Sequence, residues 1–251
     1  YLEEAAETVE LGPGPASESY LRIETVIQAA KQSGCAAVHP GWGLLAENAR
    51  FAALCEQHGL KFIGPSPAVM DQMGLKVASR QAATAAGLPV VPGSDGLLAD
   101  ADEAVRVAEQ VGYPVALKAD AGGGGRGIRR CESADEVRTA FAEASREAAA
   151  AFGNAALYLE KYLDGGRHIE FQVLGDGHGA AIHLGERQCS IQRRHQKLLE
   201  EAPSPALDAE LRAHYGQLCA RATAQWRYAG PRPMEFPRAP DGQPYFPALN
   251  T

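Results

Sequence analysis

The segment YPVALKADAGGGGRGIRR, residues 113–130, carries the strongest fold signal in the chain. Residues 113–118 are predicted to form an apolar strand and residues 128–131 a second strand, and a glycine-rich loop joins the two. Residues 122–127 match the spacing GxGxxG, but in dinucleotide-binding proteins that motif opens a helix, and here it leads into a strand. A hairpin tip dense in backbone N–H groups can instead close over an anionic ligand, and Lys118 adds a positive charge for phosphate. The alternative interpretation is a surface loop without a ligand, beside a surface lysine.

On both sides of this hairpin, predicted helices alternate with short apolar strands. In the first part of the chain this alternation predicts a parallel sheet with helical crossovers, in which ligands bind at the carboxyl ends of the strands. The expected fold class is therefore α/β with α+β character. The expected helices are residues 17–30, 48–57, 67–87, 102–111, 208–226 and one that begins after a capping box at 133–136, and the expected strands are residues 8–11, 36–38, 60–63, 157–163, 168–174 and 180–185.

Composition and charge exclude several classes of protein. The 251 residues suffice for one large or two small domains, and 45% hydrophobic with 22% charged residues are typical of a globular chain. A formal net charge of −7 disfavours nucleic acid as a partner. No apolar run approaches the roughly 20 residues of a membrane span, and no signal-peptide pattern opens the chain. The five cysteines form no CxxC pair, which favours reduced thiols and an intracellular enzyme, cytoplasmic or, in a eukaryote, in the mitochondrial matrix.

Two further segments carry candidate ligand-binding residues. LYLEKYL, residues 157–163, suits an adenine hinge in which the Glu160 carbonyl meets the base edge while Tyr162 and Leu163 pack against its faces. An amphipathic strand end explains that segment equally well. CSIQRRHQKLLEE, residues 189–201, is dense in charged and amide side chains and predicts an extended active-site loop, with a charged helix face as the alternative.

The candidate metal ligands are few. His168 and Glu170 lie two residues apart on a predicted strand and so share a face, but without a third ligand nearby they are weak evidence for a metal site. Hard divalent cations at phosphates need carboxylate or amide oxygens, which Glu235 and Asn250 offer near the end of the chain.

Together these segments resemble the biotin carboxylase family of ATP-grasp ligases. The resemblance runs through the chain in one order and implies four parts: a partial Rossmann-like N-terminal domain over residues 1–65, a helical linker over 66–90, an ATP-grasp lid domain over 91–162, and a partial C-terminal ATP-grasp domain over 163–251. It rests on the hairpin segment and on HPGWGLLAEN (39–48), FIGPSP (62–67), MGLKVASR (73–80), GLPVVPGSDG (87–96), YLEKYL (158–163), RHIEFQVLGDGHG (167–179), ERQCSIQRRHQKLLEEAPSP (186–205) and ALNT (248–251).

The resemblance also implies a reaction. ATP phosphorylates bicarbonate, with Mg²⁺ or Mn²⁺ as the metal, and the carboxyphosphate carboxylates biotin linked to a biotin carboxyl carrier domain; a carboxyltransferase then uses the product, in a homo-oligomer or larger carboxylase complex. Lys197 is expected near bicarbonate as the catalytic residue, and Glu235 and Asn250 are expected at the metal. The residues expected at ATP are Lys76, Lys118, Gly123, Gly124, Gly125, Glu160, Lys161, Leu163, His168, Gln192 and His195.

The chain departs from the family pattern in three places. Before Lys76, Leu75 replaces the usual Asp. In the glycine-rich loop, Asp120 and Ala121 cost one glycine and add a negative charge near the expected phosphates. Near the end, Ala248 occupies the position of a metal-bridging carboxylate. Six of the 16 prolines fall in the last 21 residues, and Pro237 and Pro247 disagree with the central strands expected there, because proline cannot donate to a sheet ladder.

Three explanations account for these departures: a fragment, a degenerate relative that still binds ATP, or a catalyst with a different metal arrangement. We favour the fragment, because the departures concentrate at one end while the nucleotide motifs are intact. The alternative function is a catalytically impaired or noncatalytic nucleotide-binding or assembly module. Another ATP-grasp ligase, such as a carbamoyl-phosphate synthetase, is not expected to carry QRRHQK together with HPGWGLLAEN.

Overall fold

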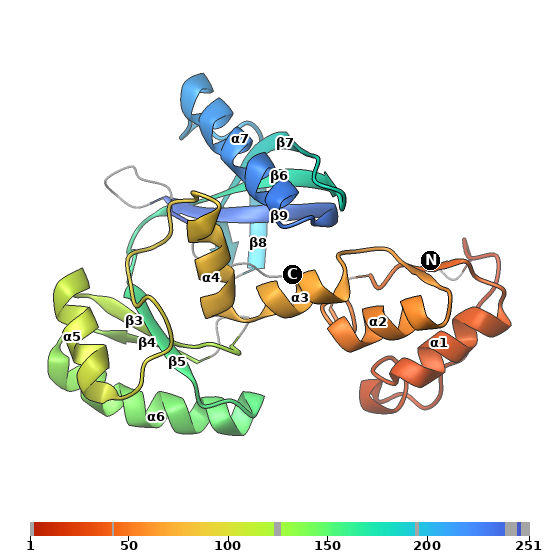
Figure 1. Cartoon of the computed structure of the whole chain (residues 1–251), viewed down its shortest axis with the longest axis horizontal. Coiled ribbons are helices and arrows are strands. Elements are labelled where there is room, and N and C mark those ends of the chain that lie inside the picture. The colour runs from red at the N-terminus through yellow and green to blue at the C-terminus, as the bar shows by residue number, and fades with distance from the viewer. Residues whose placement is uncertain (1–2, 42, 123–126, 194–195, 239–244, 247–251) are drawn as a thin grey trace. The chain divides into compact units, whose positions relative to one another are not determined.

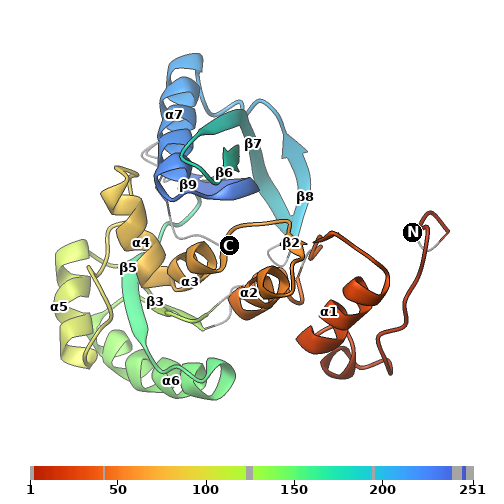
Figure 2. The same cartoon turned by 45° about the vertical axis from the view of Figure 1, so that its right-hand side comes forward.

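The computed structural model describes the chain except for residues 1–2, 42, 123–126, 194–195, 239–244 and 247–251. The predictions for Gly123, Gly124, Gly125, His195, Pro247, Ala248 and Asn250 therefore lie outside the described residues. The chain divides into two compact units, Tyr1–Asp71 and Gln72–Asn250 (Figures 1 and 2). The four domain ranges expected from the resemblance remain predictions. Among the described residues, no helix is both long enough and apolar enough to cross a membrane.

The first unit has its own small core. Its two short strands pair in parallel, as the helix–strand alternation predicts. The core includes Phe51 and Phe62, whose rings meet edge to face at 5.8 Å. The strand predicted at residues 8–11 is wrong: that stretch forms no strand, and Val9 is 46% exposed, so no packing favours one there. The elements are a 3-10 turn η1 (Ala16–Glu18), α1 (Ile23–Gln32), β1 (Ala37–Val38), α2 (Ala49–Gln57) and β2 (Lys61–Phe62).

The segment predicted as one helix over residues 67–87 forms two, α3 (Pro67–Gly74) and α4 (Lys76–Ala85). Leu75 between them is extended, with φ −88° and ψ 132°. A distant loop satisfies the start of α4, because the Val77 N–H donates to Asp120 Oδ1 at 2.9 Å and the Lys76 N–H to the Asp120 carbonyl at 3.3 Å. Through these contacts the buried Asp120 caps the N-terminal end of α4. The helix dipole favours a negative charge at that end.

The predicted glycine-loop hairpin is confirmed. Strands β3 (Val115–Ala119) and β4 (Ile128–Cys131) pair antiparallel, and β5 (Leu157–Lys161) lies on the other side of β3. Helices α5 (Ala101–Val111) and α6 (Ala134–Phe152) share a hydrophobic core with this three-stranded sheet (Figure 1). Ser133 caps α6 as predicted, since its Oγ accepts the Glu136 N–H; the Glu136 carboxylate accepts the N–H of Glu132 and not that of Ser133.

The third sheet has four antiparallel strands: β6 (Arg167–Asp176), β7 (Ala181–Arg193), β8 (Gln196–Glu201) and β9 (Ala229–Arg238). Their order is β8-β7-β6-β9, and α7 (Ala209–Gln225) packs on the sheet (Figure 2). Residues of β6 alternate, so Ile169 and Phe171 are buried in the core and His168 and Glu170 share the opposite face. The extended loop predicted at residues 189–201 is wrong, because most of it belongs to the antiparallel strands β7 and β8.

The three prolines of β9 are compatible with the strand in which they lie. A strand does form at Pro237, because β9 pairs with β6 in register from Ala229 to Arg238. All three prolines of β9 lie at odd-numbered positions, 231, 233 and 237. In an antiparallel pair, every second residue directs its backbone N–H and carbonyl away from the neighbouring strand, so a proline there removes no hydrogen bond to β6. The Pro237 carbonyl confirms this direction, because it accepts the Tyr245 N–H at 3.0 Å.

Candidate functional site

A pocket of about 450 Å³ lies against the three-stranded sheet. Its size suits a small-molecule ligand. Four residues predicted at ATP line it together: Lys118 from β3, and Glu160, Lys161 and Leu163 from the end of β5 and beyond. The other lining residues are Val91, Ala116, Ile128, Arg130, Tyr162 and Pro237.

After the first two backbone N–H groups that follow residue 160, the N–H groups of residues 163–166 donate to no backbone group that the structure describes. The N–H groups of Lys161 and Tyr162 donate to the carbonyls of Pro92 at 2.7 Å and Pro114 at 3.1 Å. The N–H of Leu163 has no backbone partner among the described residues. The Lys161 ammonium is used elsewhere, because it donates to the carbonyls of Gly112 and Tyr113. Beside the pocket, backbone N–H groups of this kind suit the adenine hinge predicted from the sequence.

Beneath the pocket, a buried carboxylate holds two cations. Glu160, with its side chain 4% exposed, forms ion pairs with Lys118 through Oε1 and with Arg80 through Oε2, the latter at 3.2 Å. Arg80 comes from α4 and is itself buried, whereas the Lys118 side chain is 22% exposed. The sequence assigned a role only to the Glu160 backbone; its side chain was missed, as was Arg80.

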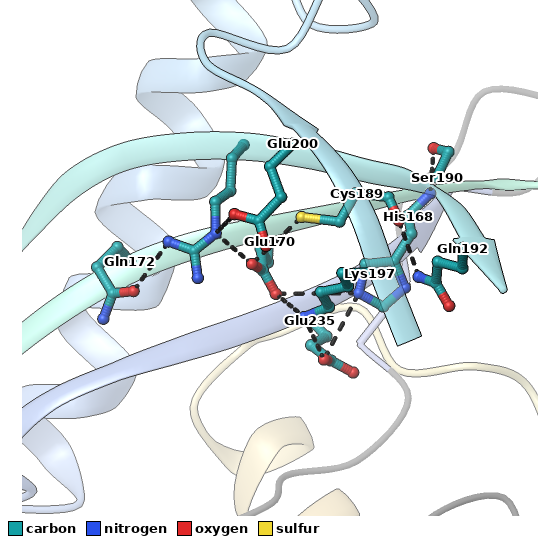
Figure 3. A network of polar contacts seen from close by, with 10 residues as sticks. His168, Glu170, Gln172, Cys189, Ser190, Gln192, Lys197, Glu200 and Glu235 are labelled. Atoms are coloured by element: carbon teal, nitrogen blue, oxygen red, sulfur yellow. Dashed lines mark hydrogen bonds and ion pairs between the residues drawn. The ribbon is translucent and has the colours of Figure 1, made fainter. Parts of the chain in front are cut away.

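A second polar group lies on the open face of the four-stranded sheet (Figure 3). The carboxylate of Glu170, fully buried, forms ion pairs with Arg187 and Lys197. Lys197 Nζ also lies 3.1 Å from Glu235 Oε1, and His168 Nε2 lies 3.5 Å from the same oxygen. Strands β6, β7, β8 and β9 each supply one or more of these side chains, so the sheet register brings them together.

The charges of this group hold one another in their ionised forms. Burial by itself would raise the pKa of Glu170, but the hydrogen bond and charge of Lys197, with Cys189 and Arg187, lower it on balance. Contact with His168, followed by the charge of Lys197, lowers the pKa of Glu235 to about 2 against the effect of burial. Burial opposes the ammonium form of Lys197, yet Glu170 and Glu235 raise its pKa. The group therefore presents two carboxylates and an ammonium at neutral pH.

The pocket and the polar group adjoin. Pro237 lines the pocket and is the register partner of His168 on β6. Gln192 is the register partner of Lys197, and its Nε2 donates to the Cys189 carbonyl at 2.8 Å. Lys76 is half-buried at the start of α4, outside the lining set given above.

Family comparisons match the chain in two stretches. Residues 1–70 match "Biotin carboxylase, N-terminal domain", and residues 76–251 match "Carbamoyl-phosphate synthase L chain, ATP binding domain". Biotin carboxylase 2, chloroplastic, from Populus trichocarpa is 51% identical over all 251 residues, which cover 48% of that protein. Biotin carboxylase from Nostoc sp. is 49% identical over the whole chain and 56% of its own length.

The chain belongs to the biotin carboxylase family. Solved structures agree, and with them the predicted α/β ATP-grasp fold class is confirmed. The biotin carboxylase–beta-gamma-ATP complex from Campylobacter jejuni superposes with a TM-score of 0.95 at 45% identity, over the whole chain and 56% of that structure. A second structure is the biotin carboxylase domain dimer of Hydrogenobacter thermophilus 2-oxoglutarate carboxylase, solved with MgADP, ADP and bicarbonate. It superposes with a TM-score of 0.93 at 48% identity, over 100% of this chain and 55% of that structure. The chain spans about half the length of these biotin carboxylase relatives.

The magnesium ion that the family implies fits Glu235. Its carboxylate is ionised and partly exposed, and its described contacts with His168 and Lys197 all use Oε1. Oxygen ligands of this kind suit Mg²⁺. The cluster of His168, Glu170 and Glu235, whose ligand atoms lie within 4.8 Å of one another, is instead occupied by the Lys197 ammonium. Glu235 is therefore the candidate magnesium ligand within the part of the chain that the structure describes. Asn250, the second predicted ligand, lies outside that part and remains a prediction.

Proposed function

We propose that this protein takes part in the ATP-dependent carboxylation of protein-linked biotin with bicarbonate, the first half-reaction of a biotin-dependent carboxylase. The observation that carries the proposal is the adjacency of the Lys118–Leu163 pocket and the Lys197–Glu235 group, in a chain about half identical to named biotin carboxylases. Relatives solved with ADP, magnesium and bicarbonate support these ligands.

In this proposal each group has a task. Leu163 N–H meets the adenine edge, and Lys118 neutralises charge on the nucleotide phosphates. Lys197, held by Glu170 and Glu235, presents an ammonium toward bicarbonate and the phosphate transferred to it. Glu235, with Asn250, holds Mg²⁺, which neutralises phosphate charge when bound. Phosphoryl transfer depends on such positioning and charge neutralisation more than on covalent chemistry by the protein.

The proposed roles extend to the remaining predicted site residues. His168 and Gln192 line the ribose and phosphate side, Lys76 contacts the nucleotide, and Gly123, Gly124 and Gly125 with His195 complete the phosphate site. The proposed partners are a biotin carboxyl carrier domain, a carboxyltransferase and a second copy of the chain. In support, 2-oxoglutarate carboxylase of Hydrogenobacter thermophilus has a matching chain named as a small subunit and a biotin carboxylase domain solved as a dimer. We also propose a cytoplasmic location, which the five free thiols support.

Nucleotide binding tests the proposal on this chain. Lys118→Ala is expected to raise the Kd of MgATP, measured by isothermal titration calorimetry, by about tenfold or more, since a charged hydrogen bond to phosphate is lost. Lys61→Ala is the control, because Lys61 is exposed on β2 in the first unit. Equal effects of the two substitutions would rule out the phosphate role of Lys118. The reaction itself is tested by bicarbonate- and biotin-stimulated ATP hydrolysis.

A further inference from the structure

Glu160 is paired with one fixed cation and one exchangeable cation. Arg80 is the fixed one: it is buried, its Nη2 donates to the Val91 carbonyl at 2.8 Å, and its guanidinium lies 6.0 Å from the centre of the Tyr158 ring. Lys118 is the exchangeable one, because it lines the pocket and keeps 22% of its side chain exposed.

The charge balance around Glu160 changes when a phosphate enters the pocket. Lys118 can bind a phosphate oxygen only by loosening its pairing with Glu160. A carboxylate that is 4% exposed tolerates this only if another cation stays beside it, since an unpaired buried charge is strongly unfavourable. Arg80, held at 3.2 Å from the other carboxylate oxygen, is that cation.

We infer that Arg80 is a positioning residue that allows Lys118 to leave Glu160 for the nucleotide phosphates. The inference rests on the proposed function, in that it takes a phosphorylated nucleotide as the ligand of the pocket. Without the charge of Arg80, Glu160 retains Lys118 as its counter-ion, and phosphate binding weakens. Recognition of the adenine and ribose does not depend on this exchange.

The contrast between ADP and adenosine tests the inference. Arg80→Gln keeps a side chain that can donate to Val91 and removes the charge. We expect it to raise the Kd of ADP, measured by calorimetry, by about tenfold or more, equivalent to about 1.4 kcal/mol. The Kd of adenosine, measured by NMR titration, is expected to change by less than about threefold, because adenosine carries no phosphate. Arg129→Gln is the matched control, since Arg129 lies on the same sheet in an exposed pair with Glu147.

A second pair of variants separates charge from shape. Arg80→Gln combined with Glu160→Gln removes both charges and is expected to recover most of the lost ADP affinity, because no carboxylate then retains Lys118. Arg80→Lys preserves the charge and is expected to keep ADP affinity within about threefold of the unsubstituted protein. If Arg80→Gln fails to fold by circular dichroism, Arg80→Lys and the double variant carry the test.

The outcomes are distinct. If Arg80→Gln weakens the binding of ADP and of adenosine equally, or if the double variant recovers no ADP affinity, Arg80 only shapes the pocket. Either result would overturn the inference. Failure of the unsubstituted protein to bind either ligand would instead remove the proposed function, and the inference with it.

Discussion

Glu170 is a carboxylate with no solvent exposure that holds cations from two other strands, Arg187 of β7 and Lys197 of β8. Glu170→Gln leaves both cations without their shared anion, so we expect the free energy of unfolding to fall by about 2 kcal/mol or more. Urea denaturation measures this change. Glu200→Gln is the control, because Glu200 pairs with the same Arg187 at 3.0 Å but is 44% exposed, and a loss below about 0.5 kcal/mol is expected there. Similar losses in both variants would contradict the buried network.

The pH dependence of Glu170 has a defined sign. Its pKa is lowered in the folded state from an ordinary value of 4.5, so the folded state favours the carboxylate. The stabilisation is fully present above the unfolded value and is lost as pH falls through the folded one. The stability difference between the unsubstituted protein and Glu170→Gln should therefore shrink on acidification below about pH 4.5.

Single residues were the hardest features to predict from the sequence. Motifs indicated Lys118, Glu160 and Lys197. The structure places the first two at the pocket and Lys197 in the adjoining polar group. Arg80 was missed because its partner Glu160 lies 80 residues away, and nothing in a helical pattern shows a long-range ion pair. Glu170 was noticed only as a weak metal candidate, although its spacing of two from His168 did place both on one face.

At the scale of elements, Asp120 joins the hairpin to the start of α4. Its Oδ1 accepts the Val77 N–H at 2.9 Å and it is 3% exposed, so Asp120→Ala is expected to cost about 1–2 kcal/mol of stability, as the loss of a helix cap does. Asp120→Asn keeps an acceptor oxygen and should cost less. Thermal or urea unfolding measures both. Asp95→Ala, at an exposed position, is the control, and a loss there as large as in Asp120→Ala would contradict the capping role.

Elements were predictable where the apolar pattern was clear. The hairpin over β3 and β4 and the capped helix α6 follow from apolar runs and a local capping signal. The β7–β8 hairpin was taken for a loop because most of residues 189–201 are polar. The apolar residues of β8, Leu198 and Leu199, are adjacent and exposed, so no alternation of apolar and polar residues marks this strand. The prolines of β9 are tolerated because of their register against β6, and that register is not encoded in the local sequence.

At the scale of the whole molecule, the fold class followed from the order of helices and strands, whereas the division into units depended on packing. Phe51 and Phe62 belong to a core within Tyr1–Asp71. Leu117 and Leu159 belong to a separate core within Gln72–Asn250, next to the pocket. Separate cores allow the two units to respond differently to a ligand.

Hydrogen exchange with mass spectrometry tests this independence. At a hundredfold excess over its Kd, ADP stabilises the conformation that binds it by about 2.7 kcal/mol. Because all the lining residues of the pocket belong to Gln72–Asn250, we expect ADP to slow exchange in β3 and β5 and to leave α2 and β2 unchanged. Lys118→Ala should reduce the protection of β3 and β5 at the same ADP concentration. Equal protection of α2 and β2 would show that the two cores unfold together, and the separation into units would then not describe the protein's energetics.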